Sequence, residues 1–141
     1  MVATVLCGTL DIADAAIFTV AHGHDPLVML RSIAACLLGP NAMRGGYAMS
    51  LVGLGMHFLI AAFWASLHVL LPGRTVAAGR YPLVVGIVYG LFIYGVMNYA
   101  VLPHTALHIP LPRPGPGMVN GVLALVMLFG VPLSLLHRKR C

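Results

Sequence analysis

The chain has 141 residues, of which 60% are hydrophobic and 8% charged, with a formal net charge of +5. Soluble domains are about 45–50% apolar and about 25% charged, so this composition excludes an ordinary water-soluble surface and indicates one covered by lipid. The basic residues are too scattered for a nucleic-acid-binding patch, and the three cysteines form no CxxC pair, which argues against a disulfide framework or a thiolate metal site.

Four apolar segments reach the length of about 20 residues that a membrane-spanning helix needs. The expected spans are residues 2–20, 47–71, 82–102 and 118–136. The first lacks the basic start of a secretory signal, so we expect it to be retained. After it, Asp25 and Pro26 predict the start of a helix and Gly39 its end. That helix, residues 26–38, is too short to span and is predicted to be interfacial or re-entrant.

The expected fold is therefore a single all-α integral membrane domain, residues 1–141, with four antiparallel spans. The short link after the second span predicts that the second and third spans form a tight antiparallel pair. The link after the third span, residues 103–117, holds five prolines and is expected to be irregular and outside the hydrocarbon. Small residues spaced four apart predict close helix packing at three places. These pairs are Ala61 and Ala65, Gly86 and Gly90, and Gly117 and Gly121.

The distribution of lysine and arginine predicts the orientation. One side, with both termini and the second link, carries five basic residues: Arg74, Arg80, Arg138, Lys139 and Arg140. The other side carries three: Arg31, Arg44 and Arg113. The positive-inside rule therefore predicts that both termini lie in the cytoplasm.

Two of the three acidic residues of the chain interrupt the first span. Asp11 and Asp14 share one helix face with Cys7, at spacings of four and seven. Because an ionised carboxylate at the bilayer centre costs at least ~2.5–3.5 kcal/mol, this face is expected to point into the bundle. Either the aspartates form a proton or cation site, or they form a buried polar latch or lie near a hydrated margin.

The second span offers a candidate partner in His57, near its middle. Three further residues share its face: Ser50, Trp64 and His68. An Asp–His contact suits a proton relay or a metal. The alternative is one histidine hydrogen-bonded within a helix interface. In the third span, Tyr94 and Asn98 are four apart and predict hydrogen bonding between helices, and Asn98 joins the candidates for the proton or cation site.

Histidines also gather in the two links on the side opposite the termini. The candidate metal ligands there are His22, His24, Asp25, His104 and His108. Imidazole and carboxylate groups suit zinc, copper or nickel, although loop histidines often have no such role. Heme between facing helices is another use of paired histidines. Its candidate ligands are His22, His57, His68 and His104. No catalytic sequence motif occurs, so we do not expect an enzyme.

Several stretches between residues 8 and 103 resemble a group of small, uncharacterised four-helix bacterial inner-membrane proteins, the YagU-like group. The matching positions are Asp11, residues 33–39, His57 with Phe58, Asn98, and Leu102 with Pro103. The resemblance implies a multi-pass protein of the bacterial inner (cytoplasmic) membrane and agrees with the choice of Asp11 and His57. It implies no specific activity and does not extend to the histidine-bearing links.

The leading hypothesis is a small multi-pass membrane protein whose Asp/His site binds or relays protons or a cation. The first alternative is a non-catalytic structural subunit or assembly factor of a membrane complex, and the second is a heme- or metal-binding protein. The expected partner is the lipid bilayer, and transport is expected to need a homo-oligomer or a partner subunit.

Overall fold

The computed structural model describes residues 2–70 and 79–138, and this part of the chain is all-helical. Four of its helices are long and apolar enough to cross a membrane: Ala3–Ala21, Gly46–Leu70, Pro82–His104 and Pro116–Leu136. A shorter apolar helix, Pro26–Leu38, lies between the first two. The predicted fold class is therefore confirmed.

The first two spans are continuous α-helices, whereas the last two change helix type along their length. The elements of the first half are α1 (Val2–Ala21), α2 (Pro26–Leu38), the 3₁₀ turn η1 (Pro40–Arg44) and α3 (Gly46–Leu70). The third span comprises α5 (Pro82–Gly95), the π-helical segment η3 (Val96–Val101) and the 3₁₀ turn η4 (Leu102–His104). The fourth comprises α6 (Pro116–Leu123), the π-helical segment η5 (Ala124–Gly130) and α7 (Val131–Arg138).

Helix α2 begins and ends where its sequence predicts. Asp25 is the N-cap, because its Oδ1 accepts a hydrogen bond of 2.8 Å from the Leu27 N–H, and Pro26 occupies the first helical turn. Gly39 follows the last residue with φ of +88°, a conformation that side chains disfavour. Its N–H donates to the Ala35 carbonyl and closes the helix.

A proline follows shortly after each π-helical segment. η3 ends two residues before Pro103, and η5 ends two residues before Pro132. Proline donates no backbone hydrogen bond, and its ring collides with the carbonyl four residues earlier in an α-helix. A wider π turn moves that carbonyl away, so these prolines explain why the third and fourth spans leave α-helical geometry.

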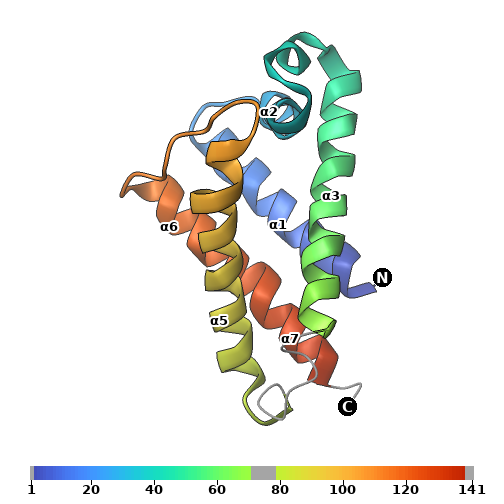
Figure 1. Ribbon diagram of the computed structural model, residues 1–141, viewed down its shortest axis with the longest axis vertical. Coiled ribbons are helices and arrows are strands. Elements are labelled where there is room, and N and C mark those ends of the chain that lie inside the picture. The colour runs from blue at the N-terminus through green and yellow to red at the C-terminus, as the bar shows by residue number, and fades with distance from the viewer. Residues whose placement is uncertain (1, 71–78, 139–141) are drawn as a thin grey trace.

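The fourth span is the central helix of the bundle (Figure 1). It packs against α5 through η5 and α7, and also contacts α1 and α3. Glycines allow this approach: a Cβ on Gly86 would lie 2.7 Å from the Val131 Cα, and one on Gly90 would lie 2.7 Å from the Val126 Cα. The expected glycine packing of the third span is thus present, and Gly130 completes it from the other helix.

The expected tight pairing of the second and third spans is wrong. α3 meets α5 through aromatic side chains, chiefly Trp64 against Tyr89 and Phe92, rather than backbone to backbone. The reason is that the glycine face of α5 is taken by the fourth span. The link itself lies mostly outside the described residues.

Most of the packed interior lies toward the end of the molecule where α3 ends and α5 begins. We call this group the apolar cluster. It consists of Cys7, Ala61, Trp64, Ala65, Tyr89, Ile93, Phe129 and Leu133, each no more than 6% exposed. It draws on all four spans and therefore closes the bundle at that end.

At the opposite end, α2 and the proline-rich link lie together (Figure 1). The Ala106 N–H donates a 2.9 Å hydrogen bond to the Cys36 carbonyl, which fastens the link to α2. α2 is itself fixed to α3, where Ser50 Oγ donates to the Leu27 carbonyl at 3.0 Å and Gly53 leaves room for the backbone of Leu30. The two links that were expected on one side of the membrane therefore share one end of the structure.

Candidate functional site

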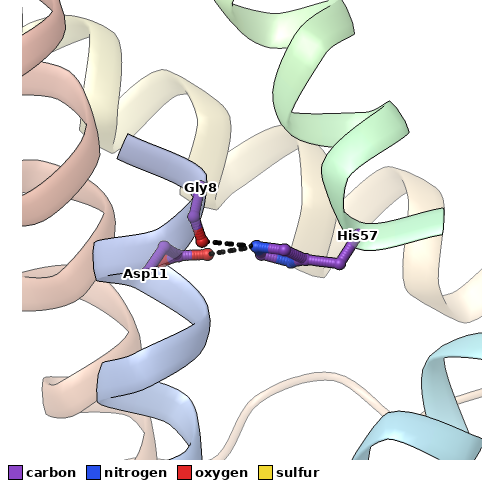
Figure 2. Close-up of polar contacts among 3 residues, drawn as sticks. All are labelled: Gly8, Asp11 and His57. Carbon is purple, nitrogen blue, oxygen red and sulfur yellow. Dashed lines mark hydrogen bonds and ion pairs between the residues drawn. The ribbon is translucent and has the colours of Figure 1, made fainter. Parts of the chain in front are cut away.

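His57 reaches from α3 to α1 and faces two oxygen atoms there (Figure 2). Its Nε2 lies 2.9 Å from the Gly8 carbonyl oxygen and 4.0 Å from Asp11 Oδ2. The side chains are mostly buried, with 12% of His57 and 21% of Asp11 exposed. The predicted contact between the polar faces of the first two spans is thus present at these two residues.

The absence of a side chain at Gly8 explains how the two helices come so close. A Cβ at this position would lie 3.1 Å from the Phe58 ring and 3.2 Å from the Ala61 Cβ. The neighbouring residue on α3, His57, is thereby brought within hydrogen-bonding distance of α1. A helix carbonyl has two lone pairs, so that of Gly8 can accept from His57 as well as from its own helix.

The geometry at the Gly8 carbonyl determines one proton on His57. A carbonyl oxygen only accepts hydrogen bonds, so Nε2 must carry the hydrogen that it donates. Asp11 faces the same N–H from 4.0 Å. An N–H nitrogen has no lone pair for a metal, so this nitrogen is not a metal ligand in the observed arrangement.

Pairing lowers the cost of placing Asp11 and His57 inside the bundle. A carboxylate at the centre of a bilayer costs ~2.5–3.5 kcal/mol on insertion scales. When both groups are charged, their attraction across about 4 Å offsets part of the cost of burying them.

Asp14 bonds to the fourth span and not to His57, which the sequence suggested as the partner of this helix face. Its Oδ2 accepts a 2.8 Å hydrogen bond from Asn120 Nδ2 on α6. Asn120 was not among the residues predicted for the site, although an amide side chain near the start of an otherwise apolar span is a signal in itself. The bond joins residues 106 positions apart in the chain and connects the first span to the fourth.

Asn98 does not join the site. Its Nδ2 donates a 3.0 Å hydrogen bond to the Tyr94 carbonyl on its own helix. No hydrogen bond or ion pair among the described residues connects it to Asp11, Asp14 or His57. The expected bonding of Asn98 between helices is therefore wrong, and the amide partner of the site is Asn120.

The polar face of the second span turns inward as expected, but its members meet different helices. Ser50 bonds to α2, and His57 to α1. Trp64 and His68 instead lie against Tyr89 on α5, with ring centroids 6.5 and 4.7 Å from that of tyrosine. His57 is the member of this face whose ring reaches α1, at Gly8 and Asp11.

The structure does not bring the link histidines together into a ligand set. His22 and His104 each place Nδ1 against a carbonyl of the preceding helical turn, at 2.8 and 2.7 Å, and Asp25 caps α2. His24 and His108 are exposed. Within residues 2–70 and 79–138, no three His, Cys, Asp or Glu residues are grouped as a metal site requires.

The two aspartates of α1 and their side-chain partners form a layer of half-buried polar groups, which we call the polar layer. It consists of Asp11, Asp14, His57 and Asn120. It begins one helical turn from Cys7 and Ala61 of the apolar cluster. The layer holds two carboxylates, one imidazole and one amide, which can accept, donate and store protons.

Comparison with known proteins gives no match, whether to a family model, a curated protein or a solved structure.

Proposed function

We propose that this small multi-pass membrane protein binds and releases protons at the Asp11–His57 pair. The observation that carries the proposal is the position of His57 Nε2, at 2.9 Å from the Gly8 carbonyl and 4.0 Å from Asp11. It places one N–H in a hydrogen bond with the Gly8 carbonyl and 4.0 Å from a carboxylate oxygen, inside a membrane-spanning bundle. Ionisable groups in such a position are costly and are found where ions or protons are handled.

A proton fits this site better than a metal cation. The nitrogen that faces Asp11 is a hydrogen-bond donor, so it repels a cation at the point where a ligand is needed. The second carboxylate, on Asp14, is engaged by the amide of Asn120 at 2.8 Å. Asp14 and Asn120 support the pair by keeping a second hydrogen-bonding group next to it on α1.

Infrared difference spectroscopy of the protein in lipid nanodiscs tests the proposal. The carbonyl band of a protonated carboxyl group is expected to appear as the pH falls and to disappear as the pH rises. The chain has three acidic residues, so single substitutions assign the band. We expect Asp11→Asn to abolish it and Asp25→Asn, at the exposed cap of α2, to leave it in place. A band unchanged by Asp11→Asn would contradict the proposal.

His57→Gln separates a paired site from an isolated carboxyl group. Glutamine keeps a donor for the Gly8 carbonyl but cannot be charged, so the pH at which the Asp11 band titrates should change. If Asp11 titrates identically with histidine and glutamine at position 57, the two groups do not act as a pair.

A structural role is the rival function. The His57–Gly8 and Asp14–Asn120 bonds both tie α1 to helices distant in the sequence. Such bonds lock helices together in lipid, as expected of a subunit or assembly factor. This rival predicts that Asp11→Asn retains the full function of the protein, whereas the proton site predicts that function is lost while the fold survives.

The proposed location is the bacterial inner membrane, as in the YagU-like group that the sequence resembles. The positive-inside rule adds that both termini lie in the cytoplasm. In support, Arg31 lies in α2 and Arg44 at the end of η1, whereas the sequence assigns the larger basic group to the side with the termini and the second link. Transport of protons through a chain of this size would need a second copy or a partner subunit.

A further inference from the structure

The polar layer is closed on one side by tight packing. Cys7 lies one turn before Asp11 on α1 and is fully buried. On α3, Ala61 lies one turn beyond His57 and is 3% exposed. Phe129 and Leu133 of the fourth span complete this barrier, at 3% and 0% exposed. The polar side chains beyond this barrier, Tyr89, His68 and Ser134, are no more than 6% exposed, so tight packing excludes water toward the end where α3 terminates.

Burial decreases along α1 from Cys7 toward α2. From fully buried Cys7 it passes to Asp11, whose side chain is 21% exposed, and then to half-buried Asp14. The partners of these aspartates, His57 and Asn120, are also short of full burial. The accessible part of the site thus lies toward α2.

The packing of the fourth span explains this change. It contacts α1 mainly through η5 and α7 rather than through α6. Where α1 and α6 separate, the side-chain bond from Asn120 to Asp14 bridges them. α2 also contacts α1, but it packs mainly along α3, at Ser50 and Gly53.

Together, we infer that the polar layer is a one-sided aqueous inlet: water reaches Asp14 and then Asp11–His57 from the α2 end, and the apolar cluster blocks the other end. The inference rests on the proposed function for the identity of the ligand, a proton carried by water. Its physical basis is that carboxylates in a membrane are tolerated where they face the bundle or a water-filled space. One chain alone then exchanges protons with a single side.

Reaction of single cysteines with a membrane-impermeant maleimide tests the inference. The parent has Cys7→Ala, Cys36→Ser and Cys141→Ser, and each test protein carries one cysteine. Asp14→Cys reports the inlet, and retention of Cys7 reports the blocked end. Leu10→Cys, 37% exposed on the apolar surface of α1, reports contact with lipid, and Leu111→Cys in the proline-rich link marks the α2 side.

We expect position 14 to react at least ten times faster than positions 7 and 10, from the side of the membrane on which position 111 reacts. Reaction of position 14 from the opposite side, or from neither side, overturns the inference, as does equal reaction at positions 7 and 14. If Asp14→Cys does not give a folded protein by size-exclusion chromatography, Asn120→Cys takes its place and keeps both carboxylates.

This result is distinguishable from failure of the proposed function. Labelling depends on water access and not on proton binding. An accessible position 14 with an infrared band unaffected by Asp11→Asn leaves the inlet in place and removes the proton site. A titrating Asp11 with an unreactive position 14 removes the inlet and leaves the proton site.

Discussion

Two neighbouring parts of the α1–α3 interface, one helical turn apart, have opposite characters. At Cys7 and Ala61 the helices are sealed by the fourth span, and both residues are nearly inaccessible. At Asp11 and His57 the same helices enclose polar groups that remain partly exposed. Helix type is the same in both parts, so the difference comes from the third element. η5 and α7 pack on α1 at the first part, whereas the fourth span meets the second part through the side-chain bond from Asn120 to Asp14.

The largest expected effect comes from breaking the sealed part. Gly90→Leu would place a Cβ 2.7 Å from the Val126 Cα and force the third and fourth spans apart. We expect a loss of about 3 kcal/mol or more, because backbone cannot yield as a side chain does. The matched control is Gly95→Leu on the same span, where a Cβ meets nothing within 4 Å. Thermal aggregation of the detergent-solubilised proteins measures the difference, and equal stability would refute the packing.

The next largest effect is expected from substitutions in the polar layer. His57→Leu leaves the Asp11 carboxylate without its partner, and we expect a loss of about 1–3 kcal/mol. The double variant Asp11→Leu/His57→Leu extends the apolar packing by one turn and should recover most of that stability. Thermal unfolding of the wild type, both single variants and the double variant gives the coupling energy. No recovery in the double variant would mean that the two side chains are not coupled.

A smaller effect compares the two asparagines of the third and fourth spans. Asn120→Leu removes the donor to Asp14 and should cost about 1–2 kcal/mol, because hydrogen bonds to charged groups are the stronger ones. Asn98→Leu removes a bond within one helix and should change stability by less than about 0.5 kcal/mol. The same thermal assay compares the two variants. A larger loss of stability for Asn98→Leu would mean that Asn98, and not Asn120, is the amide of the site.

The smallest effect concerns the α2 end, toward which the polar layer is open. Burial raises the pKa of the Cys36 thiol, and a hydrogen bond with Thr105 partly offsets this. Since the thiolate is the reactive form, alkylation of Cys36 should require a higher pH than that of an ordinary thiol, with a pKa of about 8.5. Thr105→Val removes the offset and should move the reaction to still higher pH. The pH dependence of alkylation in a protein with Cys7→Ala and Cys141→Ser measures both shifts, and ordinary thiol behaviour would contradict the burial of Cys36.

Local rules of sequence predicted most of the fold. Runs of apolar residues gave the four spans, and Asp25, Pro26 and Gly39 gave the bounds of α2, because capping depends on a few adjacent residues. The helical repeat also identified Asp11 and His57, since residues on one face of a helix can be counted without knowing its neighbours.

Neighbours in space were not determined by the sequence alone. A short link suggested that the second and third spans pair, but the glycines of α5 admit the fourth span instead. The sequence indicated Asn98 as the amide of the site, but the packing places Asn120 at Asp14 and leaves Asn98 bonded within its own helix. Which helix approaches which depends on the shapes of whole helix surfaces, and no local pattern in the chain contains that information. The sequence determined that acids lie within the membrane; the tertiary structure decided which groups face them and from which end they are open.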